Sequence, residues 1–245
     1  MASGMAPTRG DDMVHRIPRS RVVDRVPYLI ALCRDRRVLH LGFVDTGLAA
    51  GKRAGHTWLH EALAASAREL VGIDVDAAGI ADAQARGYEA YEADCQRVES
   101  MRAVPTPPGE VVLAGELLEH LERPGDFLDA AHAVIAPGGN LVLTTPNAFS
   151  VMNFASALSR RELVNPDHVS WYSATTAGTL LGRHGWRVDR LSYYFLPHLV
   201  SRPGLSSRDR FQQSMFNAFR LATLPIVKAA PLLGHGLIIE ASSTA

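Results

Sequence analysis

The sequence contains few cysteines and no excess of charge of either sign. Cys33 and Cys95 stand far apart without a paired spacing, which excludes a disulfide framework and a cysteine-built zinc cluster. Lys plus Arg and Asp plus Glu number 25 each, so no global field attracts nucleic acid or an anionic membrane. We therefore expect a cytoplasmic protein in a reducing compartment, with no nucleic-acid partner.

Long apolar runs are also lacking. The longest one near the C-terminus, 221–233, is interrupted by Pro225, Lys228 and Pro231, and we expect no stable membrane insertion. Residues 1–20 are polar, without the apolar centre of a signal peptide, and are expected to form a flexible tail. Hydrophobic residues make up 47% of the chain, enough for one substantial core in a single domain at 21–245.

Short apolar runs alternate with helical patterns along most of this domain. Strands are predicted at 37–42, 70–74, 88–92, 110–114, 140–145, 186–195 and 237–241. Helices are predicted at 21–32, 56–67, 77–86, 124–135 and 174–184, the fourth of them stopped by Pro137-Gly138-Gly139. This alternation predicts an α/β, Rossmann-like, doubly wound sheet of seven strands, mostly parallel.

Two late segments, 146–172 and 197–235, fall outside the alternation. Such insertions usually build a lid, a substrate wall or an oligomer contact, here a candidate homodimer interface. The second one contains an apolar stripe at helical spacing that is typical of core or dimer contacts: Phe211, Met215, Phe216 and Phe219. It also contains Arg202, Arg208 and Arg210, which either recognise an anionic group or lie on a solvated loop.

Polar residues and glycines follow the predicted strands at their carboxyl ends, where open parallel sheets bind ligands. Gly42 has no Cβ, so its backbone can approach a ligand closely. Asp74 is placed to accept both hydroxyls of a ribose, and Asp94 to meet the amine of an adenine; the alternative for each is a helix or turn cap. Glu116 either faces the charged end of the cofactor or is solvated.

Five stretches, in this order, resemble the motifs of class I S-adenosylmethionine-dependent methyltransferases. They are VLHLG at 38–42, LVGIDVD at 70–76, EADC at 92–95, VVLAGELLEHL at 111–121 and IAPGGNLVLTTPN at 135–147. DHVSWYS at 167–173, ahead of a helix, resembles a common branch of that family. The resemblance implies an antiparallel last strand, S-adenosyl-L-methionine as cofactor, and cofactor contacts from His40, Gly42, Phe43, Asp45, His60, Asp74, Val75, Asp94, Cys95, Gly115, Glu116 and Leu117.

The first motif departs from the usual family pattern. His40 stands where an acidic residue is usual, and Gly42-Phe43-Val44-Asp45 replaces a G-x-G run. The same departure resembles a subset of actinobacterial relatives associated with glycans. It also leaves open a catalytically silent scaffold subunit. An NAD-dependent oxidoreductase or epimerase is the other alternative, but neither a G-x-G-x-x-G turn nor a Tyr-x-x-x-Lys pair supports it.

The expected chemistry is methyl transfer to oxygen. A sulfonium already activates the methyl group, so the protein mainly aligns the nucleophile. A base helps a hydroxyl by about 10²–10⁴-fold. His120, preceded by Glu119, is the candidate base, and His168 on the late loop is the second; the alternative for both is anchoring the loop.

The acceptor side is less specific in sequence. Glu116, Glu119, Asp167 and His168 could ligate a Mg²⁺ ion that holds vicinal sugar hydroxyls. Contacts to the acceptor are predicted for Asn147, Trp171 and Tyr172. The glycan-associated relatives favour a saccharide hydroxyl as acceptor, and the alternative is O- or N-methylation of a small natural product or lipid-like metabolite.

Overall fold

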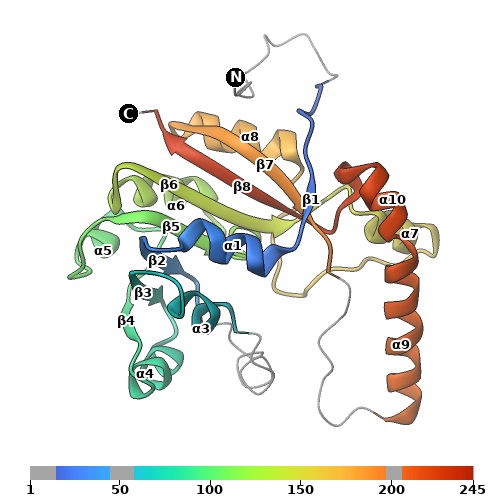
Figure 1. Cartoon of the computed structure of the whole chain (residues 1–245), viewed down its shortest axis with the longest axis horizontal. Coiled ribbons are helices and arrows are strands. Elements are labelled where there is room, and N and C mark those ends of the chain that lie inside the picture. Colours follow the sequence, from blue (N-terminus) through green and yellow to red (C-terminus); the bar gives the residue numbers. More distant parts are fainter. Residues whose placement is uncertain (1–14, 45–57, 197–205, 245) are drawn as a thin grey trace.

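The computed structural model describes residues 15–44, 58–196 and 206–244 of the chain. Its centre is a mixed sheet of eight strands in the order β1-β7-β8-β6-β5-β2-β3-β4 (Figure 1). The strands are β1 (Val22–Val23), β2 (Arg37–Leu41), β3 (Glu69–Asp74), β4 (Glu89–Glu92), β5 (Gly109–Gly115), β6 (Ile135–Pro146), β7 (Trp186–Tyr194) and β8 (Gly236–Ser243).

The pairing of these strands confirms the predicted Rossmann-like sheet. β8 runs antiparallel to both of its neighbours, β6 and β7, and all other pairs are parallel. All seven predicted strands are present. β1 is an additional strand beside β7, formed by two residues of the segment 21–32 that the sequence assigned to a helix.

Helices cover both faces of the sheet (Figure 1). They are α1 (Arg25–Cys33), α3 (Leu59–Ala64), α4 (Ala77–Ala85), α5 (Val98–Arg102), α6 (Pro124–His132), α7 (Val151–Leu158), α8 (Ala174–Arg183), α9 (Ser207–Ala222) and α10 (Leu224–Ala229), with 3₁₀ turns η1 (Leu118–His120) and η2 (Pro231–Leu233).

Side chains of the central strand β5 are buried on both faces. Val112 and Ala114 belong to the core under α5, α6 and α8, whereas Val111 and Leu113 belong to the core under α1 and α3. A strand buried on both faces is apolar at nearly every position, which explains the continuous apolar run at 111–114 in the sequence.

The predicted boundary between helix 124–135 and the next strand was wrong. α6 ends at His132, and Ile135 is already paired with Gly109 as the first residue of β6. The register then jumps, so that Asn140 pairs with Val111 and the Pro-Gly-Gly segment forms an irregularity within the strand. Gly138 has a φ of 74°, which a glycine adopts without strain.

The two late insertions contain α7 in the first and α9 and α10 in the second. α9 stands at the periphery, away from the sheet (Figure 1). Three members of its apolar stripe, Phe211, Met215 and Phe219, are 67%, 58% and 48% exposed, so they are not part of the core, and the dimer contact stays a prediction. Along the described residues, no helix is both long and apolar enough to cross a membrane.

Parallel strands β2 to β6 all end at one side of the sheet, which we call the carboxyl edge. It is formed by the segments that follow Leu41, Asp74, Glu92, Gly115 and Pro146. Most of the residues that the sequence proposed for a site lie along this edge. Asp45 and Arg202 lie outside the described residues, as do residues 1–14 of the predicted tail.

Candidate functional site

Asp74 links the ends of two neighbouring strands at the carboxyl edge. Its Oδ2 accepts a hydrogen bond from the backbone N–H of Val44 at 3.0 Å, beyond the end of β2. Its Oδ1 accepts from the N–H groups of Val75 at 2.8 Å and Asp76 at 3.1 Å. The helix-capping role belongs instead to Asp76, which accepts from the backbone of α4 at Ala78 and Gly79.

Gly42 is required by both its conformation and its surroundings. Its φ is 65°, in the left-handed region, and a Cβ placed on it would lie 2.8 Å from a methyl carbon of Leu117. Its N–H donates to the carbonyl of Ile73 at 2.9 Å. The turn after β2 is therefore held against β3 on one side and the start of η1 on the other.

Phe43 follows in this turn and directs its ring into the protein. The ring is 1% exposed and packs with Trp58, whose indole N–H donates to the Phe43 carbonyl at 2.8 Å. A Cβ on Gly72 would lie 2.7 Å from the Phe43 ring, so the glycine on β3 makes room for it. Any cofactor contact of Phe43 would therefore be made by its backbone.

His40 and His60 form a buried pair below this turn. They are 3% and 0% exposed, and their Nδ1 atoms lie 3.2 Å apart. Burial lowers the pKa of His40 to about 3 and that of His60 to about 2, and a nearby charge lowers each further, Arg25 for His40 and His40 for His60. The structure therefore encloses two neutral imidazoles where the sequence predicted cofactor contacts.

The predicted adenine side of the edge carries Val75, Asp94 and Cys95. Val75 is 64% exposed directly after β3. Asp94 accepts a hydrogen bond from the N–H of Gln96 at 2.9 Å, which is the turn-capping alternative. Burial, with the charges of Asp94 and Asp74, raises the pKa of the half-buried Cys95 thiol to about 12, so this thiol is protonated.

Glu116 belongs to a structural network. Its Oε1 accepts from the hydroxyl of Thr144 at 2.9 Å and from that of Tyr194 at 2.7 Å, and a guanidinium nitrogen of Arg25 lies 4.0 Å away. A Cβ on Gly115 would lie 3.0 Å from the same Arg25 nitrogen. The structure therefore does not bring Glu116 into one metal site with Glu119, Asp167 and His168.

Glu119, His120 and His168 form the cluster that the structure does gather. Within the described parts of the chain, one potential ligand atom from each lies within 4.8 Å of the others. The Glu119 carbonyl accepts from the N–H groups of Val169 at 2.9 Å and Ser170 at 3.2 Å, which ties the late loop to η1. The rings of His120 and His168 meet edge to face with centroids 4.6 Å apart.

Protonation within this cluster is set by burial. Burial first, and the Glu116 charge second, raise the pKa of Glu119 to about 8, so its carboxyl is neutral at pH 7. Burial and the neighbouring His120 lower the pKa of His168. The Nδ1 of His120 lies 3.2 Å from the carbonyl of Asp167, a pure acceptor, so Nδ1 carries the proton and Nε2 keeps its lone pair.

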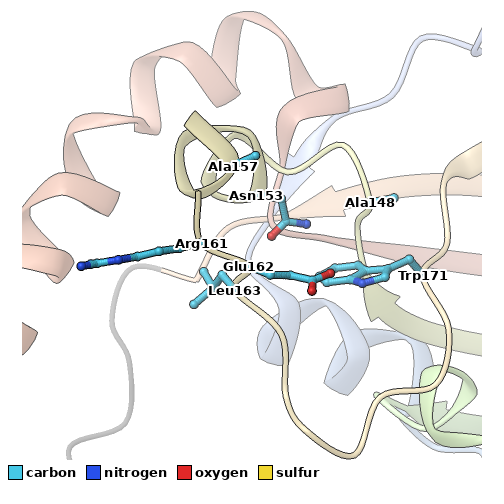
Figure 2. Close-up of a pocket in the computed structure, with 7 residues that line it drawn as sticks. All are labelled: Ala148, Asn153, Ala157, Arg161, Glu162, Leu163 and Trp171. Carbon is cyan, nitrogen blue, oxygen red and sulfur yellow. The ribbon is translucent and has the colours of Figure 1, made fainter. Parts of the chain in front are cut away.

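Two adjoining cavities open on the predicted acceptor side, between α7 and the loop that precedes α8. The larger, of about 350 Å³, is lined by Ala148, Asn153, Ala157, Arg161, Glu162, Leu163 and Trp171 (Figure 2). In Figure 2, the Glu162 side chain points toward Trp171 and Arg161 points away from it. The smaller cavity, of about 130 Å³, shares Asn153, Leu163 and Trp171 and is also lined by His168, Arg220 and His235.

Only one of the three predicted acceptor residues lines these cavities. Trp171 does, whereas Tyr172 is 6% exposed and packs into the main core. Asn147 is fully buried, and its side-chain amide donates to the carbonyls of Leu232 and Gly234, both at 2.8 Å. Its role in the structure is to hold the segment after β6 against the segment before β8.

Sequence reasoning missed Arg220 and His235. It considered the arginines at 202, 208 and 210, of which Arg208 and Arg210 are exposed on α9. Arg220 is only 4% exposed. The available signal was its position four residues after Phe216, which places both on one side of the helix.

Residues 26–191 match the model of a family described as a methyltransferase domain, which is well over half of the chain. The chain belongs to this family. The match confirms the predicted resemblance to class I S-adenosylmethionine-dependent methyltransferases, although it does not single out a glycan-associated branch.

Sequence similarity to individual methyltransferases agrees with this family assignment. A ubiquinone biosynthesis O-methyltransferase from Bradyrhizobium sp. (strain ORS 278) is 32% identical over 163 residues, which is 64% of this chain and 56% of the relative. The chain thus spans about half the length of the curated relatives it matches.

Solved structures support the fold. A SAM-dependent methyltransferase from Archaeoglobus fulgidus superposes with a TM-score of 0.52 at 18% identity, over 89% of this chain and 90% of that one. One from Mesorhizobium loti gives 0.50 at 17% identity, over 88% and 95%. At such identities, the likeness confirms the Rossmann-like methyltransferase fold and carries no information on the acceptor.

Proposed function

We propose that this chain transfers the methyl group of S-adenosylmethionine to a hydroxyl oxygen. The observation that carries the proposal is the joint placement of Asp74 and His120 at one edge of the sheet. Asp74 holds the turn containing Gly42 and presents its carboxylate beside the exposed Val75, a setting suited to a ribose and the adenine attached to it.

The residues of this chain have distinct tasks in the proposed reaction. The bound donor supplies a methyl group that its sulfonium sulfur already activates. Gly42 and Asp74 hold the donor, and the cavities beside Trp171 orient the acceptor hydroxyl toward it. His120 takes the hydroxyl proton on Nε2 as the oxygen–carbon bond forms and the carbon–sulfur bond breaks, which leaves S-adenosylhomocysteine and a methyl ether.

Transfer to oxygen, rather than to nitrogen, is supported by two observations. Relatives at about 31–32% identity are named O-methyltransferases. In the tautomer of His120 described above, Nε2 can accept a proton from a hydroxyl. A hydroxyl acceptor needs such a base more than a neutral amine does.

The experiment that tests this proposal is calorimetric titration with S-adenosylhomocysteine, followed by a screen of acceptors that reads out its formation. Asp74→Ala should weaken donor binding about 100-fold, which corresponds to about 2.7 kcal/mol. Asp76→Ala is the matched control: it removes a helix cap at a cost of about 1 kcal/mol of stability and should leave donor affinity unchanged. A wild-type protein that binds no donor would instead support a silent scaffold, and stabilisation by NAD would support an oxidoreductase.

The cluster of Glu119, His120 and His168 offers a second candidate use, as a divalent-cation site. One carboxylate and two imidazoles suit a transition metal better than Mg²⁺, which prefers oxygen ligands. Glu119 would have to lose its proton on binding. Running the acceptor screen after EDTA treatment, and again with Mg²⁺, Mn²⁺ or Zn²⁺ added, separates a metal-dependent reaction from one that relies on His120 alone.

For the acceptor, a saccharide hydroxyl remains our first candidate. It is supported by the unusual turn after β2, which resembles glycan-associated relatives, and by Trp171, whose ring is suited to stacking on a sugar. The alternative, O- or N-methylation of a small natural product or lipid-like metabolite, is supported by the apolar residues Leu163, Val164 and Leu196 around the smaller cavity.

We also propose that the chain forms a homodimer through α9. The support is its exposed stripe of Phe211, Met215 and Phe219 on a peripheral helix. Sedimentation of the wild type and of Phe211→Glu with Phe219→Glu tests it: the wild type should sediment as a dimer and the variant as a monomer.

A further inference from the structure

A buried arginine that has no acidic partner among the described residues borders the acceptor cavity. Arg220 is 4% exposed, its guanidinium carbon lies 5.9 Å from the ring centroid of Phe216, and its Nε–H has no hydrogen-bond partner. No carboxylate of the described residues lies within 4.0 Å of it.

Arg220 donates a hydrogen bond to a second buried side chain, the imidazole of His235. Its Nη2 donates to Nδ1 of His235 at 3.2 Å, and the N–H of Leu196 donates to the same atom at 3.0 Å. Because Nδ1 accepts both bonds, the proton of the neutral ring is on Nε2. That Nε2–H is buried and also has no partner. Burial, with the Arg220 charge, lowers the pKa of His235 to about 4, so the ring is neutral at pH 7.

Two unpaired N–H donors, one of them on a buried guanidinium, are costly in a largely apolar wall unless a ligand completes them. An anion with two or more acceptor oxygens is the group that matches this set of donors. We propose that Arg220 and His235 bind a carboxylate or phosphate group of the methyl acceptor.

The position of this anion site agrees with the chemistry of the site beside it. His168 lines the same cavity and its ring lies against His120, the candidate base. The cavity is otherwise bordered mainly by apolar side chains, including Leu163 and Val164. The acceptor is therefore an acidic molecule whose hydroxyl points to the histidines, whose apolar or ring-shaped body fills the middle, and whose anionic group reaches Arg220. This inference rests on the proposed function, because it assigns the acceptor class of the same site.

Direct binding of small anions tests the inference without knowledge of the natural acceptor. The probes are benzoate, its neutral isostere benzamide, and inorganic phosphate, titrated into protein labelled with ¹⁵N-arginine. We expect benzoate or phosphate to shift one arginine Nε–H signal that is missing from Arg220→Met. Binding should be at least about ten-fold weaker in that variant, since it loses a charge-assisted hydrogen bond. Arg208→Met, which removes an exposed arginine of the same helix, should bind like the wild type.

Each result has a defined meaning. Binding of benzoate alone identifies a carboxylate acceptor, and binding of phosphate alone identifies a phosphate acceptor. Equal binding of benzoate and benzamide, or unchanged binding in Arg220→Met, would overturn the inference. Arg220→Lys keeps the charge and loses the planar fork, so it should bind with intermediate affinity and provides a reading if Arg220→Met does not fold.

Titration of the same samples with S-adenosylhomocysteine reports on the donor site independently. Arg220→Met should keep the wild-type affinity for it. A wild type that binds the anions but not S-adenosylhomocysteine would count against the proposed methyl transfer alone. The converse result would count against the anion site alone.

Discussion

The Nδ1 atoms of His40 and His60 lie 3.2 Å apart in the protein interior, beneath the turn that contains Gly42. Because only one proton can lie between them, one ring donates and the other accepts, and the hydrogen bond cannot persist once both rings are protonated. The rings of Phe43, Trp58 and Tyr88 surround His60 at centroid distances of 4.5, 5.1 and 5.2 Å, which leaves little water to solvate a charge.

Acid should therefore unfold this protein partly through the histidine pair. The folded pKa values of about 3 and 2 lie below the usual 6.5, so the unfolded state binds more protons as the pH falls below about 6.5. Stability conferred by the pair is present above pH 6.5 and is lost between pH 6.5 and about 3. The pH dependence of unfolding should contain a contribution that approaches about 2.7 kcal/mol per pH unit for two protons.

Urea unfolding of the wild type and of the double variant His40→Leu with His60→Leu between pH 7.5 and 4.5 measures this contribution. The variant should have the shallower dependence on pH. If both proteins have the same slope, the two histidines are not neutral in the folded state.

Glu119 should make the protein less stable to unfolding as the pH rises, as expected for a buried acid. Its folded pKa of about 8 lies above the usual 4.5, so the folded state holds a proton that the unfolded state has lost. Its stabilising contribution is present below pH 4.5 and is lost as the pH rises towards 8, by about 1.4 kcal/mol per pH unit. Glu119→Gln, which imitates the neutral acid, should remove this loss.

Thermal unfolding in metal-free buffer from pH 5.5 to 8.5 makes the comparison. The control is Glu122→Gln, an exposed glutamate three residues further along, which should behave as the wild type. A pH dependence that is identical in Glu119→Gln and in the wild type would show that Glu119 is already ionised.

His120→Ala should separate turnover from donor binding. We expect S-adenosylhomocysteine affinity to be unchanged and kcat to fall by about 10²–10⁴-fold, because the hydroxyl loses its base. His120→Gln keeps an N–H donor for the carbonyl of Asp167 and so keeps the loop anchored, but it cannot accept a proton. A kcat restored by glutamine would mean that His120 only positions the loop, and normal turnover of the alanine variant would exclude it as the base.

Gly42→Ala should damage the donor site in two separable ways. The alanine backbone would have to adopt a φ of 65°, at a cost of about 1 kcal/mol. Its methyl group would also lie 2.8 Å from the side chain of Leu117. Gly87→Ala is the control for the first effect, since its φ is 87° and nothing lies within 4 Å of the added Cβ. Adding Leu117→Ala to Gly42→Ala should restore stability to the level of Gly87→Ala; no recovery would mean that the steric contact is unimportant.

The parts of this fold that the sequence predicted are those that depend on chain-local patterns. β2, β3 and β5 are short apolar runs that end in glycine or aspartate, and their positions fixed the carboxyl edge. The five-residue helix α5 was missed because it buries only Met101 and so has no periodic pattern. The end of α6 was misplaced because a Pro-Gly-Gly segment is also typical of a helix stop.

The predicted site was limited by side-chain direction and by distance along the chain. Glu116 follows a strand as a ligand-binding residue would. Its backbone has a φ of 57°, and its side chain accepts hydrogen bonds from Thr144 and Tyr194. Arg220 and His235 reach the cavity only because α9 and the segment before β8 pack beside a loop that lies far earlier in the chain. Neither relation leaves a pattern in any one stretch of sequence.

The place of β8 in the sheet has a consequence for how the molecule is made. β8 comes after every other strand in the chain, yet it separates β6 from β7 and pairs with both. A nascent polypeptide that has emerged from the ribosome as far as β7 therefore exposes two unpaired strand edges, and the β1–β7 pair cannot join the rest of the sheet. Assembly must wait until residues 236–243 have been synthesised.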